Sequence, residues 1–218
     1  MALVAAQPGL SASVPVSFDA ADTPRWLTVL GVTPVTIRSS RQERLIVLGA
    51  DGRVVRIVDG GEGHVPLPAD LDRLLNHAGE GLTLVHNHPS GNGLSADDLS
   101  QLDKAGVATV VAVGHDGSVY AASRGARFPA AGFTGFDDAV YDTARQAAHR
   151  VQSSERDPQA RAAFDAHMHH VLAQALTAAG VLTYRFTLGA DRSRSFSNAR
   201  VYLARVRDAA RPKIGADR

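Results

Sequence analysis

The pattern of apolar and polar positions predicts strands in the first half of the chain and helices in the second. Runs rich in Val, Ile and Leu predict strands at 26–30, 35–37, 45–48, 54–58, 82–85, 107–113 and 119–122. The Asp51-Gly52 pair lies between two of these runs and predicts a β-hairpin. The run at 107–113 is almost wholly apolar, which is typical of a strand buried on both faces.

Helical spacing of apolar residues appears between the strands and dominates the second half. Helices are predicted to begin at Pro68 and at Ser95, and further helices are predicted at 139–151, 164–179 and 198–209, with one more strand at 184–188. This order favours an α/β domain at 24–124 with a mixed sheet flanked by helices. An Ala/Ser/Pro-rich segment at 1–23 precedes it, and a mainly helical C-terminal extension at 125–218 follows.

Two histidines close the predicted strand at 82–85, in the stretch His86-Asn87-His88. Side chains i and i+2 of a strand leave the same face, so both imidazoles could bind one metal ion. A Gly-rich loop then leads to Ser95, and Asp98 lies in the first turn of the predicted helix. Two histidines, one carboxylate and an open position are typical of a catalytic zinc site. The spacing of Ser95 and Asp98 also fits a helix capping box, an alternative that needs no metal.

The residues from His86 to Gly91, followed by Ser95-x-x-Asp98, resemble the metal-binding motif of the JAB/MPN (JAMM) zinc metalloprotease superfamily. Within it, the chain is most similar to the RadC-like branch and to JAB domains of phage-associated proteins. The resemblance covers about residues 41–120. It departs from the usual motif at one point: six residues (89–94), rather than seven, separate the second histidine from the serine.

This resemblance implies a JAB/MPN-type sheet with cytidine-deaminase-like layering, and zinc (Zn²⁺) bound by His86, His88 and Asp98. It also implies an upstream glutamate that takes the proton of the attacking water, and Ser95 as a donor to the oxyanion. Glu43, Glu62 and Glu80 precede the histidines, and Glu43 is our choice because such families place this residue just before the hairpin. The implied activity is cleavage of a peptide or isopeptide amide bond, with a peptide or protein, ubiquitin-like tails included, as substrate.

Composition narrows the setting of this chemistry. The chain of 218 residues contains no cysteine, so a metal would have to be bound by His and carboxylate ligands. We expect a cytoplasmic protein with no membrane segment, since no apolar run approaches about 20 residues and the N-terminus lacks a basic signal-peptide region.

Charge is uneven along the chain and leaves two other functions open. From Arg185 onward there are nine Lys or Arg and three Asp, a net charge of +6, which leaves −5 for residues 1–184. A basic segment could bind nucleic acid, as in a RadC-like DNA-associated protein, or it could simply be a solvated helix face. The helical extension could also serve a phage-related assembly module, and a homo-oligomer is compatible with its apolar faces.

The remaining polar residues are expected to have structural roles. Asn87 points away from the face of the two histidines and is expected to tie down the following loop. His167, His169 and His170 lie on the predicted long helix, where no acid completes a metal motif, so a polar helix flank is expected.

Overall fold

The computed structural model describes residues 41–77, 79, 81–130, 132–133 and 141–215, with the side chains of the last helix described as far as Arg211. The predicted N-terminal segment 1–23, the predicted strands at 26–30 and 35–37, and Glu80 lie outside the described residues.

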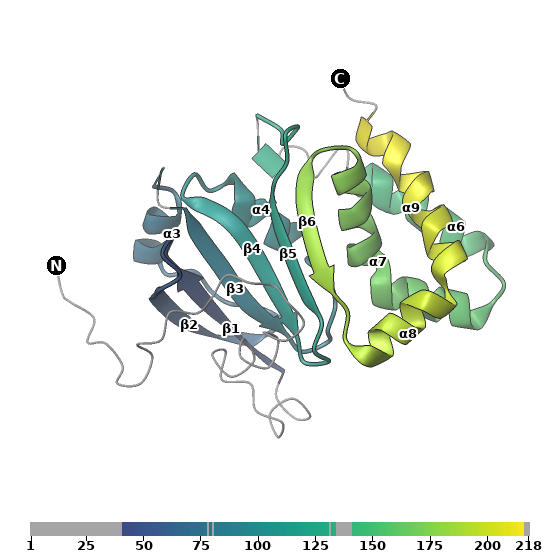
Figure 1. Cartoon of the computed structure of the whole chain (residues 1–218), viewed down its shortest axis with the longest axis horizontal. Coiled ribbons are helices and arrows are strands. Elements are labelled where there is room, and N and C mark those ends of the chain that lie inside the picture. The colour runs from purple at the N-terminus through teal and green to yellow at the C-terminus, as the bar shows by residue number, and fades with distance from the viewer. Residues whose placement is uncertain (1–40, 78, 80, 131, 134–140, 216–218) are drawn as a thin grey trace.

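The described chain forms an α/β fold with one six-stranded mixed sheet flanked by helices, as the sequence predicts (Figure 1). The elements follow one another as β1 (Gln42–Leu48), β2 (Val54–Glu62), α3 (Ala69–Leu75), β3 (Leu82–His88), α4 (Ala96–Ser100), the 3₁₀ helix η2 (Gln101–Asp103), β4 (Val107–Gly114), β5 (Val119–Arg124), α6 (Asp142–Ser154), α7 (Pro158–Ala178), β6 (Leu182–Thr187), α8 (Ala190–Asn198) and α9 (Arg200–Gly215).

The strand order is β2-β1-β3-β4-β5-β6, and only β3 and β4 run parallel. The predicted hairpin is confirmed: β1 and β2 pair antiparallel, and Gly52 takes a positive φ in the turn between them. The connection from β3 to the parallel β4 passes through α4 and η2, which places the start of α4 beside the end of β3.

The sheet carries a different apolar cluster on each face. One cluster combines alternate strand residues, such as Leu84, Val110 and Tyr120, with residues from every described helix. The other cluster consists, among the described residues, of strand side chains alone, including Ile46, Val85 and Val111. Val110 and Val111 are both buried on opposite faces, which confirms the prediction for the central strand.

The second half of the chain shares the sheet and the core of the first half. β6 pairs antiparallel with β5 along its whole length, from Val119 opposite Thr187 to Arg124 opposite Leu182. Phe164 of α7 and Val206 of α9 belong to the same cluster as Leu84. The predicted division near residue 125 therefore marks a change of sequence pattern within a common core.

The second half differs from the prediction at two points. The helix predicted at 198–209 is present as α9, but the chain before it, for which no helix is predicted, forms a separate helix, α8, that ends at Asn198. His167 and His170 are not a polar flank of α7, because both are buried, with exposed fractions of 1% and 0%. They contact the rings of Phe196 and Phe186, and only His170 has a hydrogen bond, from its Nδ1 to the Tyr184 hydroxyl at 2.9 Å.

Because these imidazoles are buried, we expect the free energy of unfolding to fall in mild acid. Burial, and then the positive charge of Arg192, lowers the pKa of His167 to about 4, while burial and His167 lower the pKa of His170 to about 3. Unfolding exposes both rings to water, where their pKa returns to about 6.5. Between about pH 6.5 and 4 the unfolded chain therefore binds more protons, and each ring should reduce the free energy of unfolding by up to about 1.4 kcal/mol per pH unit.

Urea denaturation at pH 7.5, 6.0 and 5.0 measures this effect. His167→Phe should reduce the pH dependence by about one proton, whereas a substitution of the exposed His77, His77→Asn, should not. Equal pH dependence in the His167→Phe variant and the wild type would contradict the assignment.

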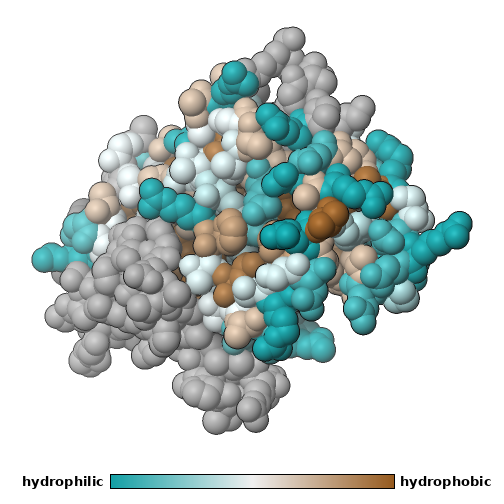
Figure 2. Space-filling view, turned by 45° about the vertical axis from the view of Figure 1, so that its right-hand side comes forward, coloured by the Kyte–Doolittle hydropathy of each residue, from teal (hydrophilic) through white to brown (hydrophobic). Residues whose placement is uncertain are grey.

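The surface visible in Figure 2 is mainly hydrophilic, with hydrophobic side chains in small separate areas. Within the described part of the chain, we find no helix whose length and apolar character would suit a bilayer span.

Candidate metal centre

His86 and His88 lie at the C-terminal end of β3 and project from the same face of the sheet. This is the face of Leu82 and Leu84, which precede them by the two-residue repeat of a strand. The two Nε2 atoms are 2.7 Å apart, and the side chains are only 9% and 12% exposed. The predicted convergence of the two imidazoles is therefore present in the structure.

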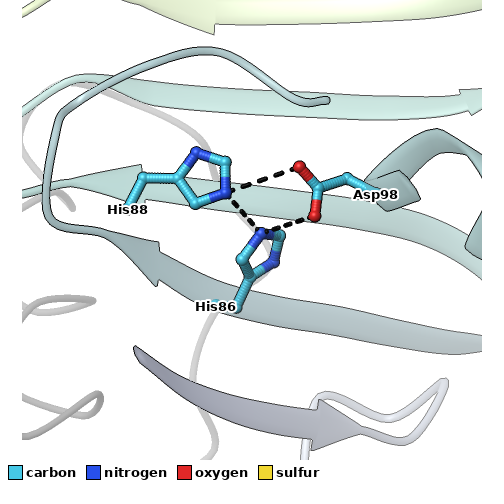
Figure 3. A group of neighbouring side chains, drawn as sticks. All are labelled: His86, His88 and Asp98. Atoms are coloured by element: carbon cyan, nitrogen blue, oxygen red, sulfur yellow. Dashed lines mark hydrogen bonds and ion pairs between the residues drawn. The ribbon is translucent and has the colours of Figure 1, made fainter. Parts of the chain in front are cut away.

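Asp98 reaches this pair from the first turn of α4 (Figure 3). Its Oδ1 lies 3.0 Å from Nε2 of His86, and its Oδ2 lies 3.4 Å from Nε2 of His88. The same carboxylate accepts the backbone N–H of Ser95 at 2.7 Å, while the Ser95 hydroxyl accepts the N–H of Asp98 at 3.2 Å. The capping box is thus formed, and it fixes Asp98 with its carboxylate facing the histidines. The capping box and the orientation of Asp98 as a candidate metal ligand are therefore compatible.

The six-residue loop between His88 and Ser95 is long enough to bring the three side chains together. Gly91 has a φ of +69°, and a side chain there would lie within 2.6 Å of the Asp116 carboxylate. Nδ1 of His88 donates to the backbone carbonyl of Asn92 at 2.8 Å, which orients the ring and directs Nε2 toward Asp98.

Arg192 of α8 holds the outside of this loop. Its guanidinium pairs with Asp116 at 2.8 Å and donates to the carbonyl of Ser90 at 2.8 Å. It also donates to the carbonyl of Ala166 in α7, and its side chain is only 10% exposed. One arginine therefore joins the loop of His88 to two helices from the second half of the chain.

The charges within the cluster reinforce one another. Burial acts to raise the pKa of Asp98, but the charge and hydrogen bonds of His86 and His88 outweigh it and hold that pKa well below its usual range. Burial acts to lower the pKa of His88, and the hydrogen bond and charge of Asp98 reverse this and raise it. An anionic carboxylate beside two imidazoles is a region that favours a bound cation.

A cavity of about 570 Å³ opens onto the three side chains. Glu43 of β1 and Ser95 line it, as the sequence predicts for residues of one site. Glu43 is half-buried, and burial raises its pKa, with the nearby His88 and His86 acting in the opposite direction. Glu62, the second upstream glutamate, is exposed at the end of β2 and lies 3.9 Å from Arg41.

The donor set fits zinc. The structure brings together two imidazole nitrogens and a carboxylate oxygen within 4.8 Å of one another, the ligand types zinc prefers where cysteine is absent. The Nε2 atoms of His86 and His88, 2.7 Å apart, would both be ligands of one ion. The Asn92 carbonyl leaves Nε2 of His88 available as the ligand atom.

Several residues around the site were not identified as part of it from the sequence. His169 of α7 lines the cavity, whereas its neighbours His167 and His170 are buried in the core. Helical spacing alone could have separated His169 from the other two, since it lies on a different side of the helix. Asn87, expected to tie down the loop, instead bonds to β1 and to His115. Nothing local in the sequence indicates those partners.

No family model, curated protein or solved structure matches the chain. The resemblance to the JAB/MPN superfamily therefore stays a prediction from the motif residues.

Proposed function

We propose that this protein is a zinc-dependent hydrolase of the JAMM type that cleaves an amide bond in a peptide or protein. The observation that carries the proposal is the convergence of His86, His88 and Asp98 at a cavity that Glu43 also lines. The motif resembles that of the RadC-like and phage-associated JAB branch, and we take the six-stranded mixed sheet to be the JAB/MPN-type arrangement.

His86, His88 and Asp98 would bind the ion. Zinc in such a site acts as a Lewis acid and lowers the pKa of water to about 7. Glu43 would accept the proton of the attacking water and return it to the leaving amine. Its half-buried position and raised pKa suit a group that must both gain and lose a proton near neutral pH.

Ser95 would have two roles. Its hydroxyl donates to Oδ2 of Asp98 at 2.8 Å while capping α4. Rotation about its Cβ–Oγ bond would redirect that proton into the cavity, where it could stabilise the oxyanion of a tetrahedral intermediate.

A peptide-sized substrate is compatible with the cavity. Its volume of about 570 Å³ is in the usual range for ligand sites, and its walls mix apolar residues such as Leu67 with polar ones such as His64 and His169. Because an amide is neutral, its binding does not require the walls of the cavity to carry one predominant charge.

The test is metal analysis of the purified protein together with hydrolysis assays on peptide and isopeptide libraries. We expect close to one zinc per chain, hydrolysis that stops when a chelator removes the zinc, and recovery when zinc is added back. Absence of bound zinc after incubation with the metal, or a fully loaded protein that cleaves no amide, would contradict the proposal.

Binding of nucleic acid by the basic C-terminal segment stays a prediction from the sequence. In the basic C-terminal segment, Arg192 is buried in the network around the loop, and Arg194 and Arg207 are paired with Asp191 and Asp208. We therefore advance the hydrolase alone.

A further inference from the structure

The backbone around Glu43 lies beyond the regular pairing of β1 with β3. That ladder runs from Leu48 opposite Thr83 to Leu45 opposite His86 and ends there. On the other side, the register between β1 and β2 shifts between Gln42 and Arg44, the two neighbours of Glu43. The residue proposed as the base therefore lies where β1 is least restrained by its sheet partners.

At this point the side chain of Asn87 forms hydrogen bonds with the main chain of β1. Its Oδ1 accepts the backbone N–H of Arg44 at 2.7 Å, and its Nδ2 donates to the backbone carbonyl of Gln42 at 3.0 Å. These two groups belong to the residues on either side of Glu43. A single carboxamide thus bonds to the main chain both before and after the proposed base.

The orientation of this carboxamide is fixed by all three of its contacts. The second N–H of Nδ2 faces Nε2 of His115, in the turn after β4, at 3.0 Å. A flipped amide would place its NH₂ group against the N–H of Arg44 and its oxygen against the carbonyl of Gln42. Asn87 is 1% exposed, so water does not compete for these bonds.

Asn87 and Glu43 act on opposite faces of the sheet. Asn87 lies between His86 and His88 in β3 and points to the other side, whereas Glu43 shares the face of Leu45 and lines the cavity with both histidines. Any effect of Asn87 on Glu43 must therefore pass through the backbone of β1, to which its side chain bonds.

We infer that Asn87 is a positioning residue that holds the Glu43 carboxylate in place over the metal centre. The inference depends on the proposed role of Glu43 as the base. Misplacement of a reacting group by about 1 Å can cost about 10²-fold in rate, so the peptide groups on both sides of Glu43 need such a restraint.

The test compares Asn87→Ala with the wild type and with Thr109→Val. The control removes a side-chain hydrogen bond of 3.0 Å between Thr109 and Ser123, in the same sheet but between β4 and β5. We expect Asn87→Ala to lower kcat by about 10²-fold with KM and zinc content nearly unchanged, and to speed hydrogen exchange of the Arg44 amide. Thr109→Val should retain the wild-type kcat.

A double-mutant cycle with Glu43→Gln separates positioning from a general structural role. If Asn87 acts through Glu43, adding Asn87→Ala to the Glu43→Gln variant should produce no further loss of residual activity. An equal loss in both backgrounds, a loss of zinc, or an unchanged kcat in the single variant would overturn the inference.

Failure of the proposed function gives a different result. A zinc-loaded wild type that cleaves no amide would refute the hydrolase itself. The carboxyl ¹³C resonance of Glu43 then decides the positioning claim: a shift in Asn87→Ala but not in Thr109→Val supports it, and an unmoved resonance refutes it.

Discussion

Replacing Glu43 by Gln should lower the turnover of an amide substrate by about 10²- to 10⁴-fold and leave zinc binding unchanged. The two side chains have nearly the same shape, but a carboxamide cannot accept the proton of the attacking water. Glu43 is not one of the three clustered ligand residues, so the ion should remain bound. Steady-state kinetics and metal analysis of the same preparation measure both quantities.

Glu62→Gln is the matched control for this experiment. Glu62 also precedes the histidines in the chain, but its side chain is 69% exposed and lies near Arg41. Its substitution should leave kcat close to that of the wild type. An active Glu43→Gln variant would show that Glu43 is not the base, and an inactive Glu62→Gln variant would show that the loss of activity is not specific to Glu43.

Replacing Asp98 by Asn should remove zinc from the protein and activity with it. The change eliminates the negative charge of the carboxylate that contacts both imidazoles, and it replaces a carboxylate ligand with a weaker neutral one. Loss of groups that merely orient metal ligands costs about 10–100-fold in affinity, so loss of a ligand should cost more than about 100-fold. Competition with a fluorescent zinc chelator measures the affinity.

Asp97→Asn makes the same change of charge one residue earlier in the first turn of α4, on an exposed side chain. It should retain zinc, because Asp97 does not belong to the clustered ligands. Asp98→Asn also weakens the capping box, at a cost of about 1 kcal/mol, so its fold should be checked by circular dichroism. A folded Asp98→Asn protein that binds zinc as tightly as Asp97→Asn would contradict the ligand assignment.

The central part of the site could be predicted from the sequence because its geometry is local. Alternation along a strand places His86 and His88 on one face, and the start of a helix fixes how Ser95 and Asp98 face each other. The connection between these elements is only six residues long, which limits how far apart they can lie.

The residues around this centre could not be predicted because their contacts join distant parts of the chain. Asn87 and Arg44 are 43 positions apart, and Arg192 and Ser90 are 102 positions apart. The composition predicts a strand at 184–188, and the structure has one at Leu182–Thr187, but no local pattern says that it pairs with β5. The burial of His167 and His170 likewise depends on aromatic rings from α8 and β6.

Two features determine how the chain can be truncated. They are the pairing of β6 with β5 and the hydrogen bonds of Arg192 to the loop after His88. An excised fragment ending at Arg124 would expose β5 as an unpaired strand edge and strip the covering of α7 and α9 from the shared core. It would also release the segment after His88 from its arginine anchor. A truncated form of this protein should therefore retain the six strands and the helices that cover them, and it should not end at the predicted boundary near residue 125.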